Sequence, residues 1–357
     1  MKNTYNAVAL FSGGLDSILA VKVIEEQGLS VKCLHFSSPF FGKELLLDKW
    51  SKVYNIDIEC VDISNDFINI LLARPEHGFG KLLNPCVDCK ILLMRKALEF
   101  MKAYNASFII SGEVLGQRPM SQRRDTLNVI CREGGVQGLL VRPLSAKLLN
   151  PSLAEQHGIV NRELLHDISG RGRKQQLQLA SNYGIQNIPT PAGGCMLAEQ
   201  ENASRYWMVL TRLKEPQVED FILAHTGRQF WNNQGRGEYW LSVGRDASSN
   251  AALHSLVDEN DYVFHLRDFA GPLALGRYTV NWNVDVLQDA ASFVASYAPK
   301  AVQSGCPVVV MWRRGHRGKE EELLVFPNRK TQMQWQEPNW TDAKHAKQQE
   351  LKDKILK

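Results

Sequence analysis

The feature that most constrains the fold is a glycine- and serine-rich loop near the start of the chain. Val8 to Phe11 form an apolar run, and Ser12-Gly13-Gly14-Leu15-Asp16-Ser17 follows it. Residues 18–24 then have the apolar and amphipathic pattern of a helix. This order predicts a buried parallel strand, a phosphate-binding loop and a helix whose free N–H groups and dipole attract an anion.

Each residue type in the loop suits a bound triphosphate. Gly13 and Gly14 let the backbone approach phosphate oxygens closely, and the hydroxyls of Ser12 and Ser17 can donate hydrogen bonds. Asp16 can hold Mg²⁺ or cap the helix. The loop lacks the Gly-Lys-Ser/Thr sequence of a Walker loop, so lysine-assisted transfer of a γ-phosphate is not expected.

The size and composition are those of a globular protein with two domains. The chain has 357 residues, of which 44% are hydrophobic and 22% charged. No apolar run approaches the roughly 20 residues that cross a bilayer. The few residues before the first strand are too short for a signal peptide, so we expect a cytoplasmic protein with no membrane role.

Basic residues gather in clusters that could meet a phosphate backbone. The net charge of +4 by itself says little about partners. The clusters are Arg123-Arg124, Arg162, Arg171 to Lys174, Arg313-Arg314 with Arg317, and the lysines of the C-terminal tail. The alternative for each cluster is a solvated face balanced by acidic residues.

Short apolar strands alternate with helical patterns in the first half. Further strands are predicted at residues 31–36, 57–63 and 108–113, and helices at residues 43–54 and 91–104. This alternation predicts an α/β fold, a doubly wound parallel sheet with its ligand beyond the carboxyl ends of the strands. Ser12, His35, Gly112 and Glu113 fall at such ends. We therefore expect a nucleotide site there, although His35 could equally be a packed strand-end histidine.

A Pro/Gly-rich junction at residues 188–195 separates this half from a second, smaller α+β domain. Strands of that domain are predicted at residues 240–244, 261–266, 280–282 and 307–312. The tail is polar and is expected to be loosely ordered, with a short terminal helix. The predicted boundaries are 1–198 for the first domain, 199–330 for the second and 331–357 for the tail.

The seven cysteines do not suggest a disulfide framework, because their number is odd and secretory features are missing. Cys33, Cys60, Cys131 and Cys306 lie in apolar or mixed segments and are predicted to be packed residues.

Cys86 and Cys89 form a CxxC motif in a predicted turn, and Cys195 follows two glycines in the junction, where it could reach them. Three thiolates are one short of a structural zinc site or a fully cysteine-held iron–sulfur cluster, which leaves an open position for sulfide. The alternatives are persulfide and disulfide chemistry, or a purely structural role.

Four segments resemble the tRNA thiouridine synthases of the PP-loop ATP pyrophosphatase superfamily, above all the 4-thiouridine synthases. They are Ser12 to Ser17, Asn84 to Cys89, Gly112 to Gln117 and Arg142 to Leu144, and the likeness spans residues 5–198. It implies that Ser12, Gly13, Gly14, Asp16 and Ser17 hold the ATP phosphates and Mg²⁺. It further implies that Gly112, Glu113 and Gln117 border the nucleotide and the target uridine.

The cysteine triplet, Cys86, Cys89 and Cys195, is similar to that of the iron–sulfur-dependent members of this group. That likeness implies a 4Fe–4S cluster with one free iron. In the second half, residues 242–250 and 260–272 resemble the NFACT RNA-binding domain. This weaker likeness implies that Arg245, His265 and Arg267 contact RNA phosphates, with Trp282 or Trp312 as a stacking surface or as core residues.

The expected function is that of an ATP-dependent tRNA sulfurtransferase. Such an enzyme adenylates a uridine carbonyl oxygen, releases pyrophosphate, and replaces the oxygen with sulfur as AMP leaves. The sulfur donor, sulfide or a persulfide carrier, stays open, because neither a preceding RNA-binding domain nor a following rhodanese-like carrier is evident. The alternatives are a PP-loop enzyme that acts on a small molecule and a non-catalytic RNA-binding protein.

Overall fold

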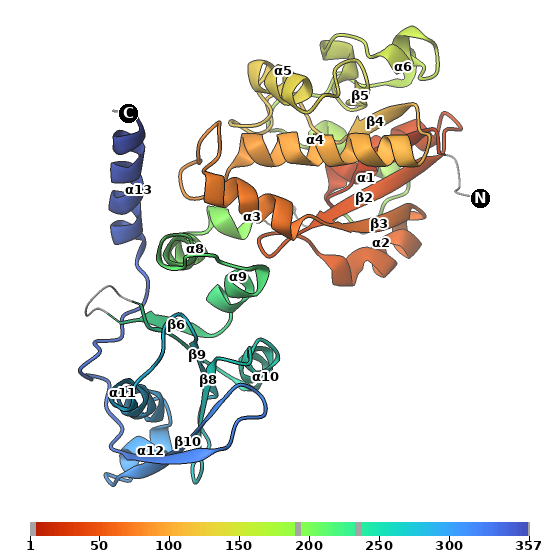
Figure 1. Ribbon diagram of the computed structural model, residues 1–357. Helices are drawn as coiled ribbons and strands as arrows, with labels where there is room; N and C mark the ends of the chain where they lie inside the picture. Colours follow the sequence, from red (N-terminus) through yellow and green to blue (C-terminus); the bar gives the residue numbers. More distant parts are fainter. Residues whose placement is uncertain (1–4, 190–193, 233–237, 356–357) are drawn as a thin grey trace. The chain divides into compact units, whose positions relative to one another are not determined.

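Figure 1 shows the computed structural model, which describes residues 5–189, 194–232 and 238–355. The chain divides into two compact units, residues 1–198 and residues 199–357. The predicted junction at residues 188–195 lies in part outside the described residues. Within the described part of the chain, every helix is too short or too polar to cross a bilayer.

Unit 1, residues 1–198, is built on a five-stranded parallel sheet in the order β3-β2-β1-β4-β5. The strands are β1 (Ala7–Leu10), β2 (Val31–Ser37), β3 (Asp57–Asp62), β4 (Phe108–Ser111) and β5 (Leu140–Val141). Ala7 pairs with Val31 on one side and with Phe108 on the other. The chain therefore leaves β1 toward one half of the sheet and returns to its other side, which makes β1 the switch point.

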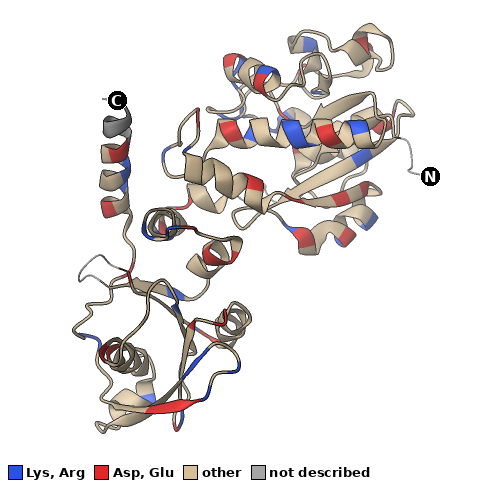
Figure 2. Cartoon of the chain, viewed as in Figure 1, with Lys and Arg blue, Asp and Glu red and all other residues tan. Residues whose placement is uncertain are grey.

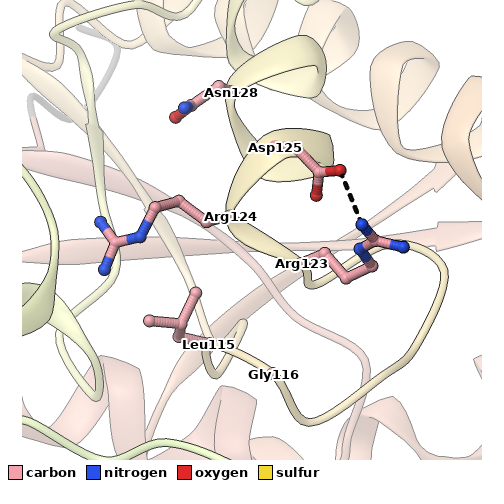
Figure 3. A pocket seen from close by; sticks show the side chains of 6 residues that line it. All are labelled: Leu115, Gly116, Arg123, Arg124, Asp125 and Asn128. Atoms are coloured by element: carbon pink, nitrogen blue, oxygen red, sulfur yellow. Dashed lines mark hydrogen bonds and ion pairs between the residues drawn. The ribbon is translucent and has the colours of Figure 1, made fainter.

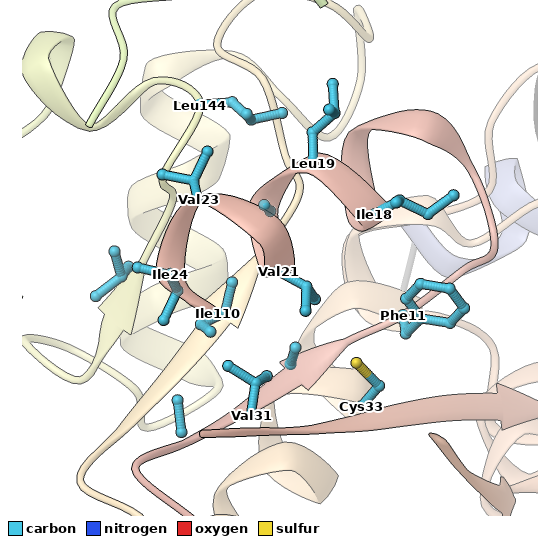
Figure 4. Packing of buried hydrophobic residues seen from close by; sticks show 14 of the residues in the cluster. Phe11, Ile18, Leu19, Val21, Val23, Ile24, Val31, Cys33, Ile110 and Leu144 are labelled. Atoms are coloured by element: carbon cyan, nitrogen blue, oxygen red, sulfur yellow. The ribbon is translucent and has the colours of Figure 1, made fainter. Parts of the chain in front are cut away.

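Helices cover both faces of this sheet, as a doubly wound fold requires. They are α1 (Leu15–Glu25), α2 (Leu47–Tyr54), α3 (Ser64–Ala73), α4 (Cys86–Ala103), α5 (Arg124–Glu133), α6 (Leu153–Gln156) and α7 (Lys174–Asn182). Helix α1 is buried on nearly all sides, because it packs against the sheet and against α7. Figure 4 shows this core, where Ile24 and Val21 of α1 lie over Ile110, Val31 and Cys33.

Two predicted helices differ from the structure at their first residues. The helix predicted at residues 43–54 is a 3-10 turn, Glu44–Leu46, followed by α2. The helix predicted from residue 91 begins at Cys86, with Pro85 as its N-cap. A proline is tolerated at a helix start, because the N–H that it lacks would have no partner there. The CxxC motif therefore lies in the first turn of α4 and not in a turn before it.

Unit 2, residues 199–357, contains a six-stranded antiparallel sheet in the order β11-β10-β8-β9-β7-β6. The strands are β6 (Arg228–Trp231), β7 (Trp240–Val243), β8 (Tyr262–Leu266), β9 (Ala274–Arg277), β10 (Val308–Arg314) and β11 (Glu321–Val325). The helices are α8 (Gln200–Arg212), α9 (Val218–Ala224), α10 (Ala247–Ser255), α11 (Val284–Ala295), α12 (Pro299–Gln303) and α13 (Trp340–Ile355). The second unit thus combines α and β elements around its own core.

The strand predicted at residues 280–282 is wrong. This stretch is a loop, and α11 begins directly after Asn283, whose side chain accepts a hydrogen bond from the N–H of Val286. Trp282 is buried and packs against Gly276 of β9, where a Cβ would lie 2.4 Å from the indole ring. The apolar character of this loop therefore comes from a side chain that enters the core.

Candidate functional site

The Ser12–Ser17 loop lies at the carboxyl end of β1, the switch point of the sheet. Gly14 is the N-cap of α1 and has no side chain to cap the first N–H groups of the helix. A helix N-terminus in this position is suited to an anion, because its N–H groups and its dipole favour negative charge. Ser12 is exposed, so its hydroxyl is accessible to a ligand.

Hydrogen bonds within the loop and one aromatic ring fix its shape. The Ser17 hydroxyl donates to the Gly14 carbonyl oxygen at 2.7 Å, and the Gly14 N–H lies 3.4 Å from the Ser12 oxygen. Gly13 has a φ of 74°, and a Cβ there would lie 2.2 Å from the Trp50 ring. Both the left-handed backbone and the close ring require glycine at this position.

Asp16 connects the loop to the segment that follows β4. Its Oδ2 accepts a hydrogen bond from Gln117 Nε2 at 3.0 Å. Its Oδ1 is buried and has no hydrogen-bond partner among the described residues. A Cβ on Gly112 would lie 2.6 Å from the Asp16 carbonyl oxygen, so glycine permits this close approach. The unpartnered carboxylate oxygen beside an anion-binding helix end fits a Mg²⁺ ion shared with phosphates.

Glu113 forms a buried ion-pair cluster one residue after Gly112. Its carboxylate lies 3.1 Å from Arg142 Nε and 3.6 Å from Lys90 Nζ. Burial raises the pKa of Glu113, but the two cations outweigh this effect and the pKa is lowered overall. Two cations therefore face one carboxylate.

His35 contacts only backbone groups through its ring nitrogens. Nδ1 lies 3.0 Å from the Phe11 carbonyl oxygen, and Nε2 accepts from the Lys43 N–H at 2.9 Å. Burial lowers the pKa of His35, so the ring is neutral at pH 7. Its edge packs on Trp50, the ring that also covers Gly13. These contacts are those of a packed strand-end histidine. His35 contacts Trp50, and Trp50 packs on the phosphate loop.

Cys86 and Cys89 differ in their surroundings. Cys86 is half-buried and its sulfur accepts a hydrogen bond from Asn84 Nδ2 at 3.0 Å. Asn84 Nδ2 also lies 4.0 Å from the sulfur of Met120, in the loop after β4. Burial raises the pKa of Cys89 to about 12, although Lys90 acts to lower it. Cys89 is therefore protonated at neutral pH in the absence of a bound metal.

Two backbone hydrogen bonds attach the segment around Cys195 to the rest of unit 1. The Leu83 N–H donates to the Leu197 carbonyl oxygen at 3.1 Å, and the Met196 N–H donates to the Phe40 carbonyl oxygen at 2.9 Å. The third cysteine thus lies on a segment joined to the one that leads into Cys86. Within the described residues, no three His, Cys, Asp or Glu side chains are placed to hold a metal together.

The RNA-binding residues predicted in unit 2 have acidic or apolar partners. Arg245 pairs with Glu201, and Arg267 pairs with Asp268 and Glu322, all on the exposed surface. His265 and Trp312 are half-buried. Trp282 is buried in the core, so its prediction as a stacking surface is wrong and its core alternative is correct.

The sequence analysis did not identify three features of the site: Lys90, Trp50 and the carboxylate partner of Arg142. Trp50 contacts Gly13, and Arg142 contacts Glu113, across wide separations along the chain. Lys90 had a local signal, since it directly follows the second cysteine of the CxxC motif. A cation next to a buried thiol is a recognised means of changing its reactivity.

The fold and the loop define unit 1 as an α/β nucleotide-binding unit with a phosphate loop at its switch point. Residues 3–147 match the model of the ThiI family, described as a thiamine biosynthesis protein. This match is shorter than half of the chain and includes the phosphate loop, the CxxC motif and residues 112–117. Together with the parallel sheet it supports a unit of the PP-loop ATP pyrophosphatase type.

Comparisons with individual proteins give more distant likenesses. An uncharacterized protein of Methanocaldococcus jannaschii is 22% identical over 129 residues, which are 35% of this chain and 45% of that protein. The chain thus spans less than half the length of this curated relative.

Similar solved structures include a predicted subunit of tRNA methyltransferase from Methanocaldococcus jannaschii, with 14% identity, coverage of 49% and 75%, and a TM-score of 0.31. The U34-tRNA thiolase NcsA from Methanococcus maripaludis, with its 4Fe–4S cluster, has 16% identity, coverage of 55% and 63%, and a TM-score of 0.30. NMN synthetase from Francisella tularensis has 15% identity, coverage of 53% and 90%, and a TM-score of 0.28. TM-scores this low do not by themselves establish a common fold.

Proposed function

We propose that the chain is an ATP-dependent tRNA sulfurtransferase, with 4-thiouridine as the first product to test. The observation that carries this proposal is the hydrogen bond between Asp16 and Gln117. It joins the phosphate loop to the segment that, by resemblance, borders the target uridine. The Asn84 amide, which contacts both Cys86 and Met120, connects the CxxC motif with the same segment. ATP, uridine and sulfur would thus meet at one edge of the sheet.

In the first half of the reaction, the uracil carbonyl oxygen attacks the α-phosphorus of ATP and pyrophosphate leaves. The N–H groups at the start of α1 stabilise the negative charge on the phosphates. Asp16 would hold Mg²⁺, which supplies positive charge to the departing pyrophosphate. Adenylation is required because a carbonyl oxygen is a poor leaving group, whereas AMP is a good one.

In the second half, a sulfur nucleophile attacks the activated carbon and AMP leaves with the original oxygen. We assign the persulfide to Cys86 or Cys195, because desolvation raises the pKa of Cys89 and keeps its thiol protonated. The other thiolate then attacks the sulfur bound to the enzyme, which releases thiouridine and leaves a disulfide. This route consumes a sulfur donor, which loads the persulfide, and an external two-electron reductant, which restores the thiols.

The resemblance implies a 4Fe–4S cluster on the three cysteines, and within the described residues no three His, Cys, Asp or Glu side chains are placed to hold a metal together. We assign unit 2 to RNA binding as an NFACT-like domain at residues 199–330, followed by a basic tail at 331–357. Its exposed arginines Arg245 and Arg267 have surface carboxylate partners, and such pairs exchange readily for phosphate. The predicted partners are therefore tRNA and a sulfur donor.

The test supplies the full chain with ATP, Mg²⁺, a donor that carries sulfur as a persulfide, a thiol reductant to reopen the disulfide, and unmodified bulk tRNA. Pyrophosphate release and AMP release are measured, and the tRNA nucleosides are analysed by mass spectrometry. Asp16→Ala should abolish pyrophosphate release, AMP release and thiolation, whereas Cys195→Ser should stop thiolation and leave one round of pyrophosphate release. Cys306→Ser is the matched control, because Cys306 is an exposed thiol in unit 2.

Three outcomes would contradict the proposal. Thiolation at the native rate by the Cys195→Ser variant would exclude the cysteine assignment. AMP release that ignores tRNA would favour a small-molecule substrate, and no ATP turnover with bulk tRNA would favour a non-catalytic RNA-binding protein. Anaerobically purified protein should also be analysed for iron, sulfide and zinc. Stoichiometric iron and sulfide would replace the persulfide route by a cluster, and zinc alone would indicate a structural site.

A further inference from the structure

The loop after β4 runs from the phosphate site to a pair of arginines. Gln117 contacts Asp16, and the neighbouring Gly116 donates its N–H to the Gln122 carbonyl oxygen at 2.7 Å. This hydrogen bond closes the loop and brings Arg123 back beside Gly116. Gly116 has a φ of 74°, a conformation that favours glycine at this turn. Arg123 and Arg124 therefore follow directly after the loop whose Gln117 contacts Asp16.

A pocket of about 600 Å³ opens at this point (Figure 3). It is lined by Leu115, Gly116, Arg123, Arg124, Asp125 and Asn128. The two arginine side chains extend to opposite sides of the pocket (Figure 3). Arg123 is 66% exposed and pairs with the similarly exposed Asp125, a type of ion pair that contributes little. Arg124 donates to the Leu148 carbonyl oxygen and has no carboxylate partner in the described part of the chain.

A second basic segment follows two residues that contact Leu115, one of the residues that line the pocket. The Gly170 N–H donates to the carbonyl oxygen of Leu115 at 2.8 Å, and Leu115 forms a parallel bridge with Ser169. The exposed Arg171 and Lys174 follow directly in the chain. Two clusters that are far apart in the sequence, residues 123–124 and 171–174, are thus brought to one side of unit 1. Figure 2 shows that Lys and Arg residues are spread over both units.

We propose that this pocket, with its two basic segments, binds the phosphodiester backbone of the tRNA next to the target uridine. The inference rests on the proposed function, since it takes tRNA as the substrate. Arginine donors on two sides suit a phosphate group, and the exposed position suits a macromolecular chain. ATP is expected on the other side of Gln117, at the phosphate loop. The catalytic unit therefore holds the RNA itself, in addition to any contact made by unit 2.

The experiment compares the double variant Arg123→Gln/Arg124→Gln and the single variant Arg171→Gln with the native full chain. The dissociation constant of a tRNA transcript is measured at several KCl concentrations, and that of ATP is measured separately. The double variant should bind tRNA on the order of tenfold more weakly. For the double variant, the slope of log affinity against log KCl concentration should be smaller in magnitude by about 1 to 2. For Arg171→Gln the slope should be smaller by about 1. ATP affinity should not change.

Arg132→Gln is the matched control, because Arg132 also lies on α5 and is 62% exposed, close to the value for Arg123. It should leave both affinities unchanged. The inference is overturned if the double variant keeps the native affinity and salt dependence, or if Arg132→Gln weakens tRNA binding as much. It is also overturned if ATP binding weakens instead, since the pocket would then belong to the nucleotide. Should the double variant fail to fold, Arg123→Gln and Arg171→Gln alone decide the same question.

The outcome is separable from that of the proposed function. A native chain that binds tRNA through these arginines but forms no thiouridine refutes the reaction and keeps the surface. A native chain that thiolates tRNA, and whose variants bind tRNA unchanged, refutes the surface and keeps the reaction.

Discussion

The side chain of Gln117 donates a hydrogen bond to Oδ2 of Asp16 at 3.0 Å, across 101 positions of the chain. The other carboxylate oxygen of Asp16 is left without a partner among the described residues. Gln117 thus fixes one oxygen of Asp16 and leaves the second available to Mg²⁺, which is expected at this loop. Groups that orient a metal ligand in this way strongly affect metal affinity.

Gln117→Ala should raise the Mg²⁺ concentration that gives half-maximal AMP formation by about 10- to 100-fold. The reason is that Asp16 would lose the donor that holds its carboxylate in place. Gln178→Ala is a suitable control, because Gln178 is exposed on α7 and its side chain bonds to Asn182 on the same helix. An unchanged Mg²⁺ dependence in Gln117→Ala would show that this contact does not orient the carboxylate.

Gly112→Ala should destabilise the protein by roughly 1–3 kcal/mol, as overpacked sites do. The added Cβ would lie 2.6 Å from the Asp16 carbonyl oxygen and must push β4 away from the phosphate loop. ATP affinity should fall in parallel. Gly172→Ala offers the comparison, because a methyl group there would meet nothing within 4 Å and the stability should change by less than about 0.5 kcal/mol. Urea unfolding curves of the two variants decide the point.

Glu113→Gln should cost roughly 3–5 kcal/mol near pH 7, because it leaves Arg142 and Lys90 buried or half-buried without their carboxylate. The pKa of Glu113 is lowered from its ordinary value of 4.5. Above pH 4.5, ionised Glu113 therefore makes its full contribution to the free energy of unfolding. That contribution is lost as the pH falls through the lower pKa that Glu113 has in the folded protein. The stability difference between native and variant should thus be constant from about pH 5.5 to 8 and shrink in more acidic solution. A difference that is the same at about pH 3 and pH 7 would contradict this assignment.

Cys60 and Cys306 are exposed, so their prediction as packed residues is wrong. Cys89 should react with iodoacetamide far more slowly than these two in protein treated with a chelator. Burial raises its pKa to about 12, so only about one thiol in 10,000 is ionised at pH 8. Peptide mapping after timed alkylation gives the rate at each cysteine. Labelling of Cys89 as fast as that of Cys306 would mean that its sulfur is ionised or accessible in solution.

Much of unit 1 could be predicted because its strands are short apolar runs followed by loops with glycine or polar residues. The phosphate loop has all its parts within six consecutive residues, Ser12 to Ser17, so a local pattern was enough. The strand β5 could not be predicted, because the two residues Leu140–Val141 are too few for any periodicity. In unit 2, β9 contains Gly276 and β11 begins with two glutamates, and neither has the composition of a typical strand.

The contacts of the site depend on tertiary structure and were beyond a local pattern. The contact of Gly13 with Trp50, and the ion pair of Glu113 with Arg142, arise only when the sheet has formed. The sequence predicts the CxxC motif in a turn because Asn-Pro commonly begins one, whereas here Pro85 precedes a long helix as its N-cap. Long-range pairing thus determines which of the conspicuous residues meet.

The hydrogen bond from Leu83 to Leu197 bears on how the first half should be expressed alone. A fragment cut after α7 at Asn182 would retain every strand of the parallel sheet and every residue matched by the family model. It would nevertheless lack Cys195 and leave the N–H of Leu83 without its acceptor, three positions before the first thiol of the motif. Fragments intended for sulfur-transfer assays should therefore extend at least to Ala198. A fragment that ends at Asn182 would serve as a control that lacks Cys195.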